Sequence, residues 1–327
     1  MVNVQSLNSE KSAMATEFWG PQTSYLNHPR TVSSPPNRTP ENSDRPPYDN
    51  QDYVITRYIA EFVNTLSSLA YVAYGLYGLF SCPQLPTGSR LFLYCGLVGV
   101  GICSGGYHMT LKYHTQMCMH PFLPTRYPPL ADHLGFEADE LSMHLLTTPL
   151  VYRLLTFQAS PRRTISIGLV LSSLFTLVMI THIVLDEFVL HAVTFASGVL
   201  IVANRVLKII SQHIPDPHVR SSLRNVSLFG CFCFGFGYFL WLIDEFACRY
   251  LTDARNVVGL PFAFFLELHG WWHILTALGS YIAVAVVDLI TSGEEVVEDP
   301  TKYMAWPVPF VASHMANSRD SVKEKAS

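Results

Sequence analysis

Two histidines stand four residues apart at the start of an apolar stretch near the end of the chain. The segment 268–287 reads LHGWWHILTALGSYIAVAVV, carries His269 and His273, and contains no Asp, Glu, Lys or Arg. Side chains at i and i+4 lie on the same face of a helix, so both imidazoles can point toward one place. The spacing is typical of paired metal ligands, and taken alone it fits a hydrogen-bonded pair between helices equally well.

A third histidine and a serine occur in the glycine-rich segment 101–114, GICSGGYHMTLKYH, where Ser104 precedes His108 by four residues. Three imidazoles around zinc leave its fourth tetrahedral position open, as in catalytic sites, which implies hydrolysis. A hydroxyl on the face of His108 can donate a hydrogen bond to an oxyanion. Taken singly, His108 also fits a packing histidine, and Ser104 fits a small residue that permits close helix contact.

An acidic pair opens the next apolar stretch. In FEADELSMHLL, residues 136–146, Asp139 stands where a carboxylate can take a proton from water and return it to a leaving group. Negative charge at the start of a helix also has a structural explanation, because it complements the helix dipole. Three histidines on or beside other apolar stretches, His144, His182 and His191, are interpreted as packing residues.

The elements that must position these residues are membrane helices. The 327-residue chain is 49% hydrophobic and 14% charged, which is too apolar for an ordinary soluble domain of this size. A bilayer core needs roughly 20 apolar residues per helix. Windows of this kind predict an all-α bundle of seven transmembrane helices, at about 62–81, 91–111, 141–158, 164–185, 188–204, 225–243 and 265–287.

Helix parity brings the candidate residues to one side of the membrane. Odd-numbered spans begin, and even-numbered spans end, at the face where the chain first enters, which we call the entry face. Glu61, His108, Asp139, His269 and His273 all fall there. Ionisable groups in a membrane are costly and usually functional, so their convergence from four helices predicts one metal site.

Polar segments flank the predicted bundle. Residues 1–57 form a proline-rich N-terminal segment, 58–290 the seven-helix catalytic domain, and 291–327 a polar C-terminal tail. The net charge of −4, without a basic patch interleaved with aromatic residues, argues against nucleic-acid binding. The bilayer is the expected surrounding, and no protein partner is predicted.

Basic residues are distributed unevenly between the two faces. The inter-helix loops hold four at the entry face, whereas eight lie at the opposite face: Arg90, Arg153, Arg162, Arg163, Arg205, Lys208, Arg220 and Arg224. The positive-inside tendency therefore predicts a lumenal entry face and a cytosolic opposite face. A glycan on the sequon at Asn37 would require a lumenal entry face.

Six segments in order along the chain carry a family resemblance: WGPQTSYLN (19–27), RYIAEFVNTLSSL (57–69), CSGGYHMTLKY (103–113), ADELSM (138–143), FLWLIDEFAC (239–248) and LHGWWHILTALGSY (268–281). Together they resemble the alkaline ceramidases, seven-helix integral enzymes of the endoplasmic reticulum and Golgi. The resemblance implies hydrolysis of ceramide, phytoceramide or dihydroceramide to a sphingoid base and a fatty acid. It assigns zinc to His108, His269 and His273, and makes Ser104 and Asp139 the catalytic pair.

The resemblance also implies a calcium site in the acidic segment PPYDNQDYVITRYIAEF, residues 46–62. Its hard oxygen ligands would be Asp49, Asn50, Asp52 and Glu61. Pro47 stands where the family pattern has its first aspartate, a departure for which Asp49 can substitute. From the residues alone, a solvated acidic turn with Glu61 paired to Arg57 explains the segment equally well.

Two other classes of function stay open. A seven-helix receptor of the adiponectin or progestin type would share a three-histidine zinc core with a signalling or structural role. Asp139→Asn should abolish turnover with zinc retained in an enzyme, and should matter little in such a receptor. The third hypothesis is a transporter that uses intramembrane histidines as proton relays. It predicts that stoichiometric zinc is absent.

Overall fold

The computed structural model describes residues 59, 61–81, 88–110, 138–185, 188–292 and 299–315. Regular structure in these ranges is helical: α2 (Phe62–Phe80), α3 (Gly88–Thr110), α6 (Ala138–Thr156), α7 (Pro161–Leu185), α8 (Phe188–His213), α9 (Pro217–Val258), η3 (Phe262–Leu266), α10 (Leu268–Thr291) and η4 (Pro300–Tyr303). The predicted calcium ligands Asp49, Asn50 and Asp52 lie outside the described residues.

Each predicted span corresponds to one long helix, so the all-α prediction is confirmed. Five of these helices, α3, α7, α8, α9 and α10, are long and apolar enough to cross a bilayer. The chain is therefore a multi-pass membrane protein. Crossing by α2 and α6, which would bring the total to seven, stays a prediction.

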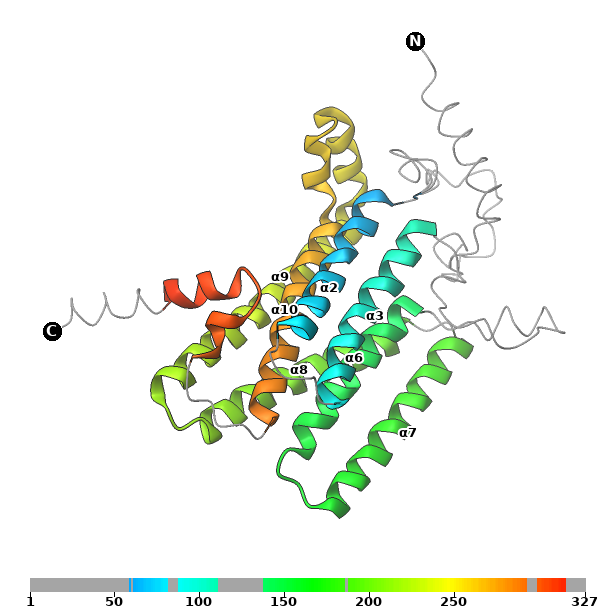
Figure 1. Ribbon diagram of the computed structural model, residues 1–327. Helices are drawn as coiled ribbons and strands as arrows, with labels where there is room; N and C mark the ends of the chain where they lie inside the picture. The colour runs from blue at the N-terminus through cyan, green and yellow to red at the C-terminus, as the bar shows by residue number, and fades with distance from the viewer. Residues whose placement is uncertain are drawn as a thin grey trace, which may run out of the picture.

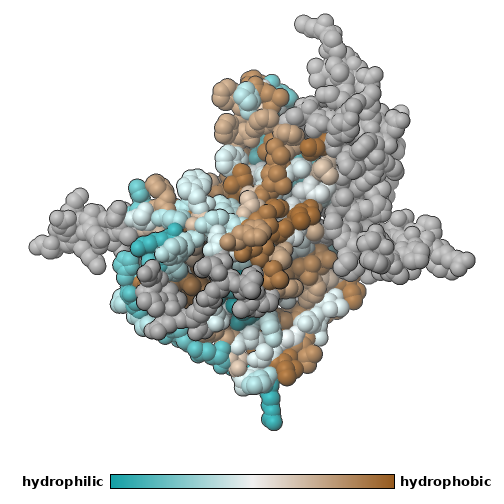
Figure 2. Space-filling view, viewed as in Figure 1, coloured by the Kyte–Doolittle hydropathy of each residue, from teal (hydrophilic) through white to brown (hydrophobic). Residues whose placement is uncertain are grey.

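Helix α10 forms the centre of the bundle (Figure 1). It packs mainly against α9 and α2, and α2 packs in turn against α3. Most α10 side chains from Thr276 onward are buried. Helix α7 lies at the edge and leaves apolar side chains such as Leu169 exposed, as expected for a surface in contact with lipid. Apolar residues are also abundant on the visible surface of the bundle (Figure 2).

Helix α9 extends well beyond the predicted span 225–243. Its 42 residues begin after the N-cap Asp216, whose carboxylate accepts from the amide of His218, and end before the C-cap Gly259, which has φ 69°. An N-cap followed by proline starts a helix, and a glycine of positive φ ends one. Both extensions contain charged residues, so they fall outside the uncharged stretch from which the span was predicted.

Two glycines allow close approach of neighbouring helices near the candidate site. A Cβ at Gly101 of α3 would lie 2.8 Å from the carbonyl oxygen of Ser68 on α2. A Cβ at Gly270 of α10 would lie 2.8 Å from Cγ1 of Val63, also on α2. Small residues at such crossings let helix backbones come together, so α2 sits tightly between α3 and α10.

Part of the segment 299–315 packs against the bundle. After η4, Met304, Ala305 and Val308 join the main hydrophobic core, and Val308 is fully buried. The amide of Ala305 donates to the hydroxyl of Tyr281 on α10 at 2.9 Å. The predicted polar tail 291–327 thus contains residues that belong to the core.

Candidate metal and catalytic site

Three histidines converge at one end of the bundle. His108 lies in the last turn of α3, and His269 and His273 lie near the start of α10. Their ligand atoms all lie within 4.8 Å of one another, and the ring centroids are 4.8 to 4.9 Å apart. His108 and His273 are each only 3% exposed. The three predicted zinc ligands thus lie together in a group that could hold a metal ion, and the identity of that ion as zinc stays a prediction.

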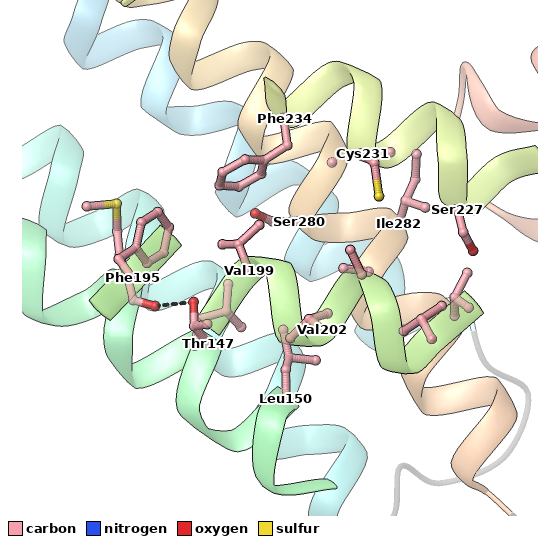
Figure 3. A pocket seen from close by; sticks show the side chains of 18 of the residues that line it. Thr147, Leu150, Phe195, Val199, Val202, Ser227, Cys231, Phe234, Ser280 and Ile282 are labelled. Carbon is pink, nitrogen blue, oxygen red and sulfur yellow. Dashed lines mark hydrogen bonds between the residues drawn. The ribbon is translucent and has the colours of Figure 1, made fainter. Parts of the chain in front are cut away.

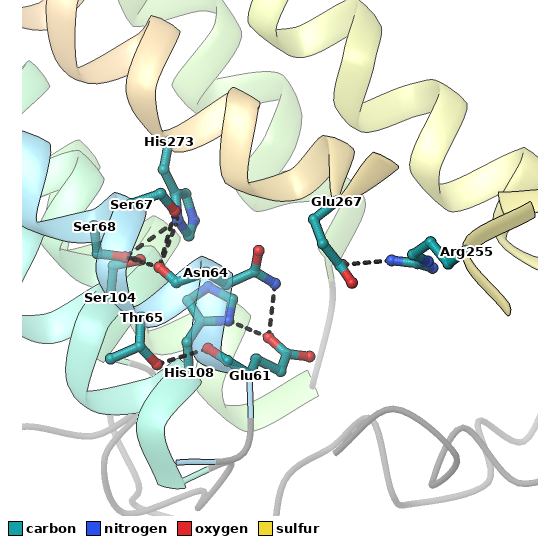
Figure 4. A network of polar contacts seen from close by, with 10 residues as sticks. All are labelled: Glu61, Asn64, Thr65, Ser67, Ser68, Ser104, His108, Arg255, Glu267 and His273. Carbon is teal, nitrogen blue, oxygen red and sulfur yellow. Dashed lines mark hydrogen bonds and ion pairs between the residues drawn. The ribbon is translucent and has the colours of Figure 1, made fainter. Parts of the chain in front are cut away.

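Helix α2 fixes the orientation of His273 (Figure 4). The Nδ1 atom lies 3.1 Å from the main-chain carbonyl oxygen of Asn64, to which it can donate. The hydroxyl oxygens of Ser67 and Ser68 lie 3.0 and 3.2 Å from the same nitrogen. With Nδ1 engaged by α2, Nε2 is the nitrogen that remains to bind a metal.

Glu61 performs the corresponding role for His108. Its Oε2 atom lies 2.5 Å from Nδ1 of His108 and accepts a hydrogen bond from the side-chain amide of Asn64 at 2.9 Å. The Glu61 amide also donates to the carbonyl of His108 at 3.0 Å. A carboxylate behind a ligating imidazole fixes its tautomer and raises its basicity. Burial raises the pKa of the Glu61 carboxyl, but His108, His269 and Asn64 together outweigh burial and lower this pKa to about 2.

Ser104 reaches the triad through Ser68. Both serines are buried, and the Ser68 hydroxyl donates to Oγ of Ser104 at 3.2 Å while lying beside His273. Asp139 is in the first turn of α6, but its side chain is not among those the structure describes. The predicted pairing of Ser104 with Asp139 therefore stays a prediction.

The start of α10 is tied to the long helix α9. Arg255 of α9 donates to the carboxylate of Glu267, the N-cap residue of α10, and Arg255 is 8% exposed. Burial raises the pKa of Glu267, and the guanidinium of Arg255 opposes that rise. The ion pair fixes the end of α10 from which His269 and His273 project.

An apolar cavity lies between α6, α8, α9 and α10 (Figure 3). It contains about 840 Å³ of empty space, part of it open to the outside. Met143, Leu150, Phe195, Val202 and Phe234 are among the residues that line it. Trp272, adjacent to His273 in the sequence, lines it too, so the cavity reaches the level of the histidines on α10.

Sequence reasoning missed the contribution of α2. Asn64, Ser67, Ser68 and Tyr71 are all buried on this helix, and the Tyr71 hydroxyl contacts Oγ1 of Thr276 on α10 at 2.5 Å. Their spacing of i, i+3, i+4 and i+7 places them on one helical face. A polar stripe along an otherwise apolar span was the signal that identifies this face.

His144, His182 and His191 form a separate buried cluster. The rings of His144 and His191 are 4.9 Å apart, those of His182 and His191 are 5.2 Å apart, and Phe195 stacks on His191. These ring contacts agree with the interpretation of packing histidines. Among the described His, Cys, Asp and Glu residues, only the first triad brings three ligand atoms within metal-binding distance.

Comparison with known families agrees with the site. The model of the family described as Ceramidase matches residues 49–316, which include every described site residue. The chain belongs to the ceramidase family. Alkaline ceramidase YPC1 of Saccharomyces cerevisiae is 29% identical over 244 residues, 73% of this chain and 73% of that protein. Alkaline ceramidase 3 of Mus musculus is 26% identical over 273 residues, 82% of this chain and 84% of that protein. The predicted class, a ceramidase-family hydrolase, is confirmed.

Proposed function

We propose that this protein is an intramembrane zinc-dependent amide hydrolase that cleaves ceramides to a sphingoid base and a fatty acid. The observation that carries the proposal is the triad of buried His108, half-buried His269 and buried His273, with ligand atoms within 4.8 Å of one another. Membership of the ceramidase family and the names of the relatives support the choice of substrate.

The protein groups divide the work of hydrolysis. Zinc, when bound by the triad, supplies Lewis acidity and makes water nucleophilic near neutral pH. The proposed role of Ser104 is to donate a hydrogen bond to the oxygen that becomes negative when water adds to the amide carbonyl. Asp139 would take a proton from the attacking water and return it to the nitrogen as the C–N bond breaks. Glu61 and Asn64 hold the imidazoles of His108 and His273 in place.

The apolar cavity is the proposed site for an aliphatic chain of the substrate. Its lining is dominated by hydrocarbon side chains, with a few hydroxyls such as those of Thr147 and Ser280. Such a lining suits ceramide, dihydroceramide and phytoceramide, whose long chains are removed from water on binding. Substrate supplied from the bilayer of the endoplasmic reticulum or Golgi fits a site inside a membrane bundle.

Calcium is a further part of the proposal. Asp49, Asn50 and Asp52 would bind it together with Glu61, which supplies a hard carboxylate ligand. Because Glu61 contacts His108, calcium bound there would act on the orientation of a zinc ligand.

The decisive experiment measures zinc and turnover in the same preparation. The protein purified in detergent is expected to contain one zinc per chain and to release fatty acid from one or more members of a ceramide panel. His269→Ala should lose both properties, because it removes one of three ligands. His213→Ala, at an exposed histidine bonded to Gln158, is the control and should keep both. Hydrolysis by metal-free protein would contradict the mechanism.

The catalytic pair has its own test. Ser104→Ala and Asp139→Asn should each reduce kcat by about 100-fold or more while zinc stays bound, since loss of one oxyanion donor and loss of a general base both have at least that magnitude. Fatty-acid release and zinc content are measured together. Unchanged turnover in both variants would show that Ser104 and Asp139 are not the catalytic pair, whereas zinc-loaded wild type without any turnover would favour a receptor with a structural metal.

A further inference from the structure

A cluster of ionic side chains lies at the end of the bundle opposite the histidine triad. Asp288 is in the last turns of α10, fifteen residues after His273, or about 22 Å along the helix axis. Its two carboxylate oxygens accept from Nε of Arg90 at 2.5 Å and from Nη2 of Arg153 at 3.2 Å. These residues join α3, α6 and α10.

A third guanidinium reaches α6 beside this cluster. Nη2 of Arg205, on α8, donates at 3.2 Å to the main-chain carbonyl of Leu154, the residue after Arg153. We call Arg90, Arg153, Arg205 and Asp288 the arginine cluster. It contains three positive charges and one negative charge.

Two guanidinium donors of the arginine cluster have no acceptor within the part of the chain that the structure describes. Nη1 of Arg153 and Nε of Arg205 are buried there and have no hydrogen-bond acceptor. Burying a charged donor without a partner costs free energy, and buried ions are normally paired. An anionic group would supply the missing acceptors.

The position of the cluster indicates where such an anion would come from. The side chains of Arg90 and Arg153 keep 17% and 15% of their surface exposed, so the edge of the cluster is open to the outside, and a small turn of the guanidinium groups would present their buried donors to an arriving anion. Exposed basic residues occur at the same end, among them Arg162, Arg163, Lys208 and Arg224. Basic pockets between membrane helices bind lipid headgroups, and the planar guanidinium matches phosphate geometry.

We propose that the arginine cluster is a binding site for a phosphate group, carried by an anionic phospholipid of the leaflet at that end of the bundle. The phosphate oxygens accept from the free donors of Arg153 and Arg205, and Asp288 holds Arg90 and Arg153 in place. The site is separate from the histidine triad and does not depend on the proposed hydrolysis.

Lipid binding is tested on the full chain in nanodiscs. Wild type in phosphatidylcholine with phosphatidylglycerol should unfold at a higher temperature than in phosphatidylcholine alone, and should keep a bound phosphatidylglycerol in native mass spectrometry. Arg153→Gln and Arg205→Gln should each weaken retention about tenfold, the loss expected for one charge-assisted hydrogen bond. Lys208→Gln removes the same charge from an exposed site on α8 and should retain the lipid as wild type does.

Two further arms make each outcome decisive. Inorganic phosphate added to phosphatidylcholine nanodiscs distinguishes a free anion from a headgroup: equal stabilisation by phosphate assigns the site to a free anion. Equal loss in Lys208→Gln, or no effect of either ligand on wild type, would overturn the proposal. A monodisperse size-exclusion profile checks that each variant is folded. If Arg153→Gln fails this check, Arg205→Gln decides, since no ion pair joins Arg205 to a described acidic residue.

Discussion

At the scale of single residues, the candidate metal site depends on the second nitrogen of each imidazole, the one that would not bind the metal. Nδ1 of His108 is held by a carboxylate, and Nδ1 of His273 by a main-chain carbonyl. The two ligands thus differ in charge environment, although they belong to the same triad. Removal of the carboxylate that contacts His108 should therefore lower metal affinity more than removal of another carboxylate at the same end of the bundle.

Glu61→Gln tests that expectation. The amide keeps the shape of the side chain but removes the negative charge beside His108, so zinc affinity should fall about 10- to 100-fold, as is usual for such partners. Affinity is measured by competition with a chelator in calcium-free buffer. The matched control is Glu245→Gln, an exposed carboxylate on α9, which should leave affinity unchanged.

At the scale of elements, α2 and α10 must lie close together for Asn64 to reach His273. Gly270 permits this contact, since a Cβ there would meet Val63 at 2.8 Å. Gly270→Ala should force the helices apart, cost about 1 to 3 kcal/mol of stability, and weaken zinc binding.

The measurement for Gly270→Ala is the thermal unfolding midpoint together with zinc content. Gly235→Ala on α9 is the control, because nothing lies within 4 Å of the Cβ it would add. A Gly270→Ala protein as stable and as metal-rich as the control would show that the close helix contact is dispensable.

The helices and the triad were predictable because each has a strong sequence signal. Uncharged windows locate the long helices, and the i, i+4 spacing of His269 and His273 combined with parity brings in His108. The extent of α9 was not predictable from these windows, since its ends are charged and helical. The role of Glu61 was also missed: its contact with His108 depends on how α2 packs against α3, which no local pattern specifies.

At the scale of the whole molecule, residues after α10 complete the core. Val308 is fully buried, and Val308→Asp should therefore destabilise the bundle by several kcal/mol, because it buries an unpaired charge. Unfolding of the purified protein in detergent measures the effect. Ser313→Asp, at an exposed position of the helical residues 308–315, should be about as stable as wild type.

The division of the triad between α3 and α10 has a consequence for biosynthesis. His108 and its partner Glu61 leave the ribosome in the first half of the chain, whereas His269 and His273 leave on the last long helix described. A chain halted before α10 holds one imidazole of the three. If the triad binds metal as proposed, the complete set of ligands forms only after α10 is inserted, so the fraction of chains that hold metal cannot exceed the fraction in which α10 is in place.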